Sequence, residues 1–316
     1  MKPYKLFIIV TATLAMAWGC RGPKVTRTDT ESSGYALIGV DETLSPVIGQ
    51  QLAVFNGLNP EAEIEPVFVS DRELFSLLMA DSVRLVVATR ELTLRQLDSL
   101  KDRKMKPRTQ RLACDGIALI VNRANPDSMI GVPALRDVMA GKITRWEELS
   151  GRGHSPLGEI QVVFDHPNSS TLRFIADSVM RGENLSGSLR ALETNAAVVD
   201  YVAANPGALG VVGVNWIKNP GDSTQLGFDP RITVMAVGTE KEVTEDNTFK
   251  PYPAFLNNGS YPLRRDVFII ITDSYGTLPS GFVKFAAGDA GQRIILKAGL
   301  VPGTRPTREV MMEESF

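Results

Sequence analysis

The chain contains few of the residues that build metal and redox centres. Its 316 residues include only two cysteines and two histidines. Neither histidine stands in a metal-ligand spacing such as H-E-x-x-H, and no cysteine pair could complete a zinc site. The same scarcity excludes a framework of disulfides. We therefore expect no metal site and no cofactor.

Several motifs of enzymes and nucleic-acid binders are missing as well. The sequence holds no G-x-S-x-G elbow, no G-x-x-x-x-G-K-[ST] loop and no G-x-G-x-x-G fingerprint. The 34 basic and 36 acidic residues give a formal charge of −2, without any run of Lys and Arg. This balance argues against a nucleic-acid partner. A hydrolase would need a nucleophile beside a base, which nothing in the sequence pairs, so no catalytic residue is predicted.

The N-terminus carries the one long apolar run. Lys2 and Lys5 precede apolar residues 6–18 and then Gly19 and Cys20, a pattern typical of a secretory signal and too short for a comfortable membrane span. The ending resembles a lipoprotein cleavage box, which predicts a signal peptide at 1–20 and a lipid on Cys20. Residues 21–34, polar and without periodicity, are predicted to be a tether. Cys114 would then have no partner and would serve packing.

From residue 35 onward, apolar strands alternate with amphipathic helices. Strands are predicted at 35–40, 64–69 and 85–89, each followed by a helix, and this order favours a parallel α/β layer. Two further strands at 108–112 and 117–121 suggest a crossing into a second unit, and the apolar strand at 267–271 suggests a return. The predicted first lobe comprises 35–113 and 264–316. The second comprises 114–263.

The segment 164–174 (FDHPNSSTLRF) joins an apolar strand to a helix that is expected to start near Ser170. Ser169, Ser170 and Thr171 then lie at the first turn, where backbone N–H groups are free and the helix dipole is positive. Such a terminus can hold an anion. Capping alone by Asn168 or Ser169 explains the same residues equally well. His166 in this loop is either a solvated turn residue or a ligand contact.

A second strand-to-helix turn of similar composition lies at 41–46. Ser45 followed by Pro46 predicts a helix start. Asp41 and Glu42 at the strand end could act in acid–base work, although residues of this kind more often cap the following turn. Asn195 is expected to cap a third helix that points toward the same enclosure. The chain therefore offers several helix starts that could converge on one ligand.

Four segments in sequence order resemble landmarks of a known family. They are 115–122 (DGIALIVN), 141–149 (GKITRWEEL), 205–210 (NPGALG) and 299–302 (GLVP). The chain is identified as a member of the phosphate-binding proteins of bacterial ABC importers, within the type II periplasmic binding proteins. The resemblance implies an α/β fold with two lobes, each a mixed sheet flanked by helices, joined by two hinge strands and closing on an oxyanion.

Position by position, the resemblance places Thr43 and Leu44 in the family's first phosphate loop. It places Asn168, Ser169, Ser170 and Thr171 on a Gly-Ser-Gly-Thr loop, with departures at Asn168 and Ser170. Where the family has an arginine before this loop, the chain has Asp165.

At a strand end where some family members have an aspartate, the chain has Arg90. We therefore hypothesise that Arg90 and Asp165 form the family's cross-cleft pair with its charges exchanged. In the alternative, Arg90 only pairs with a surface carboxylate.

These observations predict a monomeric lipoprotein, anchored through Cys20 on the periplasmic side of a bacterial membrane. It would capture inorganic phosphate or another oxyanion and deliver it to ABC permease subunits. Asp165 or Asp41 would accept the proton that distinguishes phosphate from sulfate. The alternatives are a sensing or interaction protein that kept the fold with no ligand or a different one and, less favoured, a secreted hydrolase.

Overall fold

The computed structural model describes residues 28–150, 157–219, 221–222 and 227–304. The predicted signal peptide at 1–20, including Cys20, lies outside the described residues, as do 21–27 of the predicted tether. Residues 28–33 are not a free tether. Asp29 accepts a hydrogen bond from the Leu278 amide at 3.0 Å, and Glu31 forms an ion pair with Lys284. This short segment therefore belongs to the folded body.

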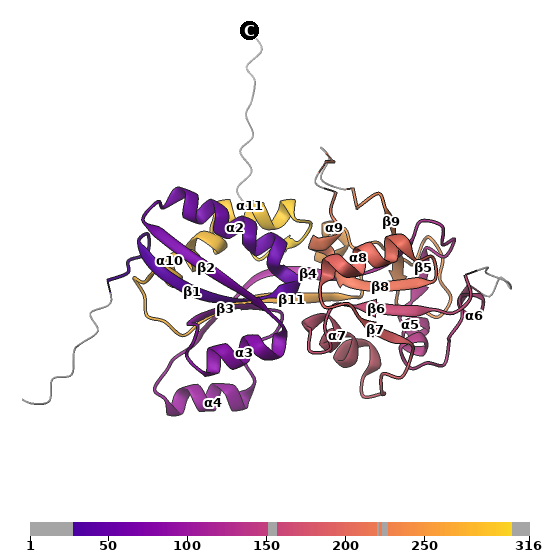
Figure 1. Cartoon of the computed structure of the whole chain (residues 1–316), viewed down its shortest axis with the longest axis horizontal. Helices are drawn as coiled ribbons and strands as arrows, with labels where there is room; N and C mark the ends of the chain where they lie inside the picture. The colour runs from indigo at the N-terminus through magenta and orange to yellow at the C-terminus, as the bar shows by residue number, and fades with distance from the viewer. Residues whose placement is uncertain (1–27, 151–156, 220, 223–226, 305–316) are drawn as a thin grey trace, which may run out of the picture.

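In Figure 1, helices and strands form two lobes, with the strands β4 and β11 running between them. The first lobe contains three parallel strands in the order β2, β1, β3, and β11 continues the sheet in the antiparallel direction. Its elements before the crossing are β1 (Gly34–Asp41), η2 (Glu42–Leu44), α2 (Ser45–Leu58), β2 (Ala62–Val69), α3 (Asp71–Met79), β3 (Leu85–Ala88) and α4 (Leu94–Asp102). Those after the return are α10 (Leu278–Ala287), α11 (Asp289–Lys297) and β12 (Val301–Pro302).

The crossing strand β4 (Arg108–Asn122) is one continuous strand, which corrects the prediction of two strands at 108–112 and 117–121. Its first part, up to Gly116, pairs with the return strand β11 (Arg264–Ile271), and its last part pairs with β8 and β9 of the second lobe. The predicted interruption at 113–116 does not break the strand because these residues still find ladder partners. The sheet is thus continuous through both lobes.

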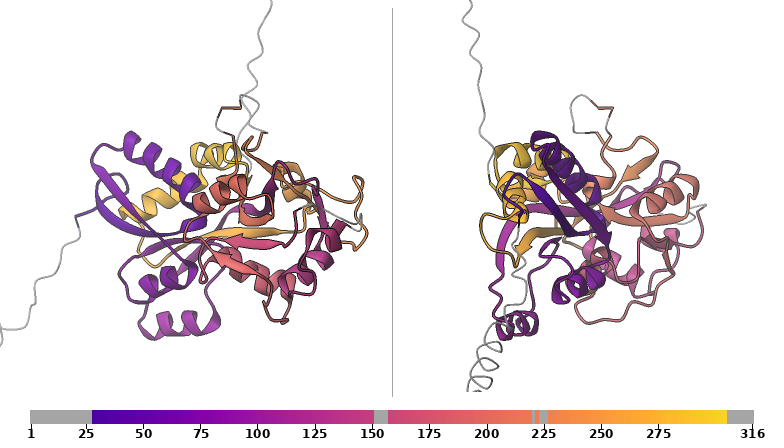
Figure 2. Two further views of the ribbon diagram at one scale, coloured as in Figure 1. Left: turned by 45° about the vertical axis from the view of Figure 1, so that its right-hand side comes forward. Right: turned by 60° about the vertical axis from the view of Figure 1, so that its left-hand side comes forward.

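The second lobe arranges β8 antiparallel to β4, followed by the parallel strands β6 and β7. The turned views in Figure 2 show its helices around this sheet. Its strands are β5 (Met129–Gly131), β6 (Gln161–Phe164), β7 (Leu189–Ala191), β8 (Ala208–Gly213), β9 (Ile232–Val234) and β10 (Ala236–Gly238). Its helices are α5 (Val132–Met139), α6 (Trp146–Ser150), α7 (Ser170–Phe174), the π-helix η3 (Ile175–Met180), α8 (Asn195–Ala204), η4 (Val214–Trp216) and α9 (Pro253–Asn258).

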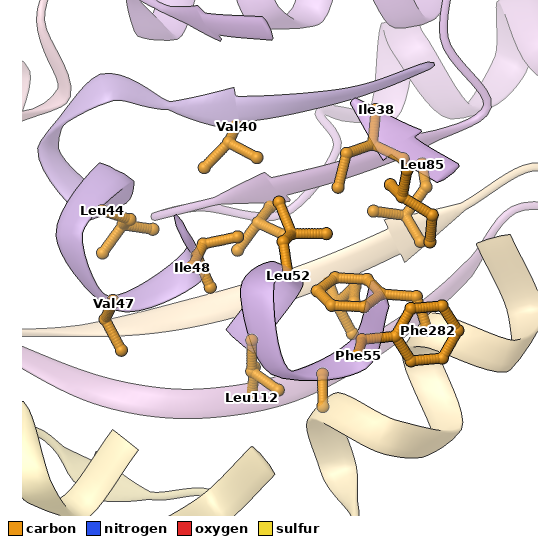
Figure 3. Close-up of a cluster of buried hydrophobic side chains, with 14 of the residues drawn as sticks. Ile38, Val40, Leu44, Val47, Ile48, Leu52, Phe55, Leu85, Leu112 and Phe282 are labelled. Atoms are coloured by element: carbon orange, nitrogen blue, oxygen red, sulfur yellow. The ribbon is translucent and has the colours of Figure 1, made fainter. Parts of the chain in front are cut away.

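Each lobe buries its own apolar side chains on both faces of the sheet. In the first lobe, α2, α10 and α11 cover one face, where Phe55 and Phe282 make an edge contact with ring centroids 5.7 Å apart. Figure 3 shows this cluster, with Leu44 and Ile48 pointing from the chain before and within α2 toward the sheet. On the other face, α3 and α4 cover a second cluster. The residues that face the space between the lobes are therefore attached to well-packed helices and strands.

Two predicted helix caps are shifted by one residue. Ser45 lies inside α2, whose N-cap is Leu44, and Thr194 rather than Asn195 caps α8. Ser70 is the N-cap of α3, but its side chain makes no cap hydrogen bond. In contrast, Thr93 begins α4 with a full capping box. Because Thr194 caps α8, the side-chain amide of Asn195 can make hydrogen bonds elsewhere.

Cys114 is buried and free, and burial raises the pKa of its thiol to about 11. It therefore packs as an inert side chain, as predicted. Within the described residues, no helix is both long and apolar enough to cross a membrane. The predicted fold class, α/β with two lobes joined by two strands, is confirmed.

Candidate functional site

A buried ion pair stands where the two crossing strands lie side by side. Arg265 on β11 and Asp115 on β4 face each other in the antiparallel register. The Nε and Nη2 atoms of Arg265 donate to Asp115 Oδ2 at 3.1 and 3.0 Å. Only 3% and 0% of the two side chains are exposed. The crossing strands β4 and β11 thus place a charged, desolvated guanidinium between the lobes.

The same guanidinium joins hydroxyl groups that come from opposite lobes. Its Nη1 donates to Ser170 Oγ at 2.8 Å and its Nη2 donates to Thr43 Oγ1 at 2.9 Å. The two hydroxyl oxygens lie 3.2 Å apart, and both residues are fully buried. The predicted convergence of the two strand-to-helix turns is therefore present, with Arg265 at its centre.

The turn after β1, which contains Thr43, is held by hydrogen bonds from both lobes. Asp41 Oδ1 accepts hydrogen bonds from the Thr43 amide at 3.1 Å and from Thr43 Oγ1 at 2.8 Å, so Asp41 is a cap. Across the cleft, Asn215 Nδ2 and Trp216 Nε1 each donate to the Thr43 carbonyl at 2.9 Å. The Leu44 side chain is buried in the first-lobe core, so only its backbone can face a ligand.

A glycine permits this close approach. A Cβ atom at Gly213 would lie 3.4 Å from the Thr43 carbonyl oxygen, 3.1 Å from Asn215 Nδ2 and 3.6 Å from Asp115 Oδ2. A Cβ atom would therefore press on the Asn215 amide, whose hydrogen bond to the Thr43 carbonyl joins the two lobes.

The second turn, between β6 and α7, places its residues at different depths. Ser169 is buried and is the N-cap of α7, with its Oγ accepting from the Leu172 amide at 3.2 Å. Thr171 is fully buried, and its Oγ1 has no hydrogen-bond partner among the described residues. Asn168 is exposed, and its amide donates to His166 Nδ1 at 3.0 Å. His166 therefore serves the turn, and Asn168 lies at the edge of the site.

Arg90 and Asp165 do not form the hypothesised cross-cleft pair. The Nε atom of Arg90 bonds to Asp71 Oδ2 at 3.2 Å, and its guanidinium stacks 3.6 Å above the Phe75 ring. Asp165 instead accepts from Asn195 Nδ2 at 3.2 Å. Arg90 prefers Asp71 because that carboxylate begins α3 within the same lobe.

A different arginine reaches across the cleft. Arg173 on α7 donates from Nη2 to Thr89 Oγ1 at 2.9 Å, and its Nε lies 3.6 Å from Asp71 Oδ2. Burial lowers the pKa of Arg173, while Asp71 opposes that shift. Thr89 and Asp71 belong to the first lobe and Arg173 to the second. This contact therefore ties the lobes together at the rim of the site.

A hollow of about 350 Å³ opens beside this rim contact, between the lobes. Its lining comes from the start of α3 and from the turn and helix after β6. These residues are Asp71, Arg72, Pro167, Asn168, Ser169, Leu172, Arg173, Ala176 and Leu185. Ser169, the chain neighbour of the buried Ser170, belongs to this lining.

Three carboxyl groups near the hydroxyl cluster have raised pKa values. Burial raises the pKa of Asp115, and Arg265 opposes the shift. Burial also raises the pKa of Asp165, against a hydrogen bond from Ser169. Glu42 on η2 has its pKa raised to about 7, chiefly by burial. A ligand here would meet one buried guanidinium, several hydroxyls and several acceptors for its own protons.

This chemistry suits a small oxyanion. Ser170 and Thr171 are the first two residues of α7, where helix N–H groups lack intrahelical partners and the helix dipole is positive. Guanidinium, hydroxyl and helix-start N–H groups are the donors that bind phosphate-like ions. Within the described residues, no group of three or more His, Cys, Asp or Glu side chains could hold a metal ion. The fold and site define a two-lobed binding protein that encloses its ligand between the lobes.

Comparison with known proteins places the chain in a family. A model of the PBP superfamily domain matches residues 25–290, and the chain belongs to this superfamily. The phosphate-binding protein PstS of Staphylococcus epidermidis is 24% identical over 246 residues, which cover 76% of this chain and 70% of that protein. PstS of Staphylococcus aureus is 21% identical over 309 residues, covering 96% and 88%. The predicted resemblance is confirmed.

A solved structure supports the fold. A phosphate ABC transporter substrate-binding protein of Clostridium perfringens, solved with bound phosphate, superposes with a TM-score of 0.70. The match covers 85% of this chain and 99% of that one at 21% identity. At this identity the likeness shows a shared fold, and the site has to be argued from the residues themselves.

Sequence reasoning missed Asp115, Asn215, Trp216 and Arg265, because they are distant from the two turns along the chain. It also missed Arg173, although this residue lies within the segment 164–174 of the second turn. Arg265 and Asp115 are separated by 150 positions. One signal was present, because Asp115 interrupts a long apolar stretch and Arg265 stands at the start of another. A charge inside a buried strand requires a partner.

Proposed function

We propose that the chain captures phosphate or a similar tetrahedral oxyanion between its lobes and delivers it to the permease of an ABC importer. One observation carries the proposal: Arg265 joins Thr43 and Ser170, one from each lobe, at 2.9 and 2.8 Å. An anion at this point would be held by both lobes at once, so binding would favour closure. The names of the relatives, phosphate-binding proteins, agree with this chemistry.

Within this proposal, 35–113 and 264–316 form lobe 1, and 114–263 form lobe 2. The change of sheet partners along β4, between Gly116 and Ile117, supports these limits. Thr43, Ser170 and Thr171 contribute hydroxyls, and Leu44 and Ser169 contribute backbone groups at the two turns. Arg265 supplies the positive charge that was predicted at Arg90.

The proposed setting is the outer side of a bacterial membrane, with the protein held by a lipid on Cys20 and working as a monomer. The signal-like segment at 1–20 supports the anchor. Replacing Cys20→Ala should shift the protein from the membrane fraction to the soluble extract. Retention of the variant in the membrane fraction would contradict the lipid anchor and leave capture of the anion untouched.

Titration calorimetry at fixed pH, with phosphate, arsenate, sulfate and molybdate in turn, tests the function. Phosphate and arsenate should bind, and sulfate should bind at least about tenfold more weakly, because it brings no proton to the buried carboxylates. Binding should also raise the melting temperature in step with RT ln(1 + [L]/Kd). If no anion gives heat or stabilisation, the chain would instead be a sensing or interaction protein without such a ligand.

A further inference from the structure

One amide group ties acidic side chains from both lobes together. Asn195 Nδ2 donates to Glu42 Oε2 at 2.6 Å and to Asp165 Oδ2 at 3.2 Å. Glu42 lies on η2 in the first lobe, whereas Asn195 opens α8 and Asp165 follows β6 in the second. Asn195 and Asp165 are buried. Closing the lobes therefore brings Glu42 out of water and next to another carboxylate.

The charges around Glu42 are of one sign. Asp41 on β1 and Asp165 after β6 both raise the pKa of Glu42, adding to the larger effect of burial. The cations of the surrounding elements serve other partners: Arg265 on β11 pairs with Asp115, and Arg173 on α7 lies against Thr89 and Asp71. An ionised Glu42 would thus be desolvated beside two acidic neighbours.

The other end of the Asn195 amide needs a donor. Its Oδ1 atom is buried and has no hydrogen-bond partner among the described residues. An ionised Glu42 has only acceptor atoms and cannot satisfy it. A protonated Glu42 has one O–H, which could be donated to Oδ1 while Oε2 keeps its bond from Nδ2. The amide and the acid would then form a matched two-bond pair, and one negative charge would disappear.

We propose that Glu42 is a positioning residue for ligand capture, which joins the two lobes through Asn195 when it carries a proton. The inference rests on the proposed function, because closure on the anion is what brings the two residues together. Capture of the ligand then includes the uptake of a proton by the protein. A protein of this kind would capture its ligand more tightly at mildly acidic pH.

The direction and size of the pH effect on phosphate affinity follow from the pKa of Glu42 with the lobes apart and with the lobes closed. With the lobes apart, Glu42 is in water with its ordinary pKa of 4.5, and closure raises the pKa to about 7. Below 4.5 the residue is protonated in both states, so closure costs nothing there. The cost develops as pH rises from 4.5 to 7 and is constant above 7. Because Glu42 is only half-buried, we expect phosphate affinity to fall by about 10- to 50-fold as pH rises through this range. The full pKa shift would give a larger loss.

Glu42→Gln provides the decisive variant. Glutamine keeps an oxygen for Asn195 Nδ2 and offers an N–H to Oδ1 at every pH, so it imitates the protonated acid. Phosphate affinity of both proteins should be measured by calorimetry between pH 4 and 8, in buffers of different ionisation enthalpy. Titration of phosphate itself affects both proteins equally and cancels in their affinity ratio. Glu91→Gln, at an exposed glutamate, is the matched control.

We expect Glu42→Gln to bind at least about tenfold more tightly than the natural protein at pH 8, with the two affinities becoming equal near pH 4, below the ordinary pKa of Glu42. The natural protein should also take up about half a proton more than the variant at pH 5.5. An affinity ratio that stays constant over this range would overturn the inference alone. Absence of phosphate binding by either protein would overturn the proposed function and the inference together.

Discussion

The centre and the rim of the cleft both contain an arginine bound to an aspartate, yet the two pairs differ in burial. At the centre, the side chains of Arg265 and Asp115 are 3% and 0% exposed. At the rim, Arg90 and Asp71 are 23% and 7% exposed. The central guanidinium also bonds to hydroxyls of both lobes, whereas that of Arg90 stays within one lobe. Residue type alone therefore does not reveal which arginine serves the ligand.

The difference in burial predicts a difference in energy. Removing one partner of a buried ion pair costs about 3–5 kcal/mol, because the other charge is left desolvated and unpaired. An exposed pair contributes about 0–1 kcal/mol. The Arg90 guanidinium is partly solvated, and Asp71 keeps a second cation in Arg173 when Arg90 is removed. Variants at the centre should consequently affect folding and binding together, whereas a variant of Arg90 at the rim should affect binding only slightly.

Arg265→Ala should have the largest effect. Loss of the guanidinium leaves Asp115 buried without a partner, so the free energy of unfolding should fall by about 3–5 kcal/mol in urea titrations. Phosphate binding should be abolished in calorimetry. The double variant Arg265→Ala with Asp115→Ala should recover much of the stability without recovering binding. Normal phosphate affinity in the double variant would show that the central pair has no role in capture.

Thr43→Val should come second. The hydroxyl of Thr43 bonds to Asp41, Ser170 and Arg265, and valine has the same shape without the hydroxyl. Leaving these buried groups unpaired costs about 1–3 kcal/mol, or about 10- to 100-fold in phosphate affinity. Thr109→Val, an exposed strand position, should leave affinity unchanged. Equal affinities for both variants would contradict a bridging role for the Thr43 hydroxyl.

Arg173→Gln should have an intermediate effect on binding and little effect on folding. The variant loses the contacts with Thr89 and Asp71 that hold the lobes together at the rim. We expect about a three- to tenfold faster release of phosphate in stopped-flow measurements, because these contacts form only on closure. Arg181→Gln, at an exposed arginine after the same helical segment, is the control. A release rate no faster than that of the control would remove Arg173 from the closing contacts.

Arg90→Ala should have the smallest effect, below about twofold in phosphate affinity and about 1 kcal/mol in stability. This variant also tests the hypothesis of a charge-exchanged pair. If Arg90 and Asp165 acted together on the ligand, Arg90→Ala and Asp165→Ala should both lower the affinity by at least tenfold. A strong loss in Arg90→Ala would return that residue to the site and weaken the contrast between centre and rim.

The turns of the cleft could be predicted because their signals are local. Thr43 and Ser170 were found from polar residues placed between an apolar strand and a helix, and this arrangement depends only on nearby sequence. Leu44 shows the limit of the same reasoning, since its side chain enters the core and leaves only its backbone near the ligand. The helix start at Ser45 was misplaced because Asp41 caps a short 3-10 turn before it.

The centre of the site could not be predicted, because it depends on the pairing of distant strands. Arg265 meets Asp115 only because β11 and β4 pair in one particular register. A shift of one strand by one residue would place Arg265 and Asp115 on opposite faces of the sheet. Arg90 was predicted instead because it follows a strand and carries a positive charge. Its partner in the structure is Asp71 of the same lobe.

The most direct test of the central claim is a crystal structure with arsenate, whose arsenic atom can be located by anomalous scattering. We expect one strong arsenic peak between the lobes, with an arsenate oxygen within hydrogen-bond distance of the Arg265 guanidinium and others bonded to groups of both turns. A peak elsewhere, or contacts with one lobe only, would contradict the proposal that the two lobes close on an oxyanion at Arg265.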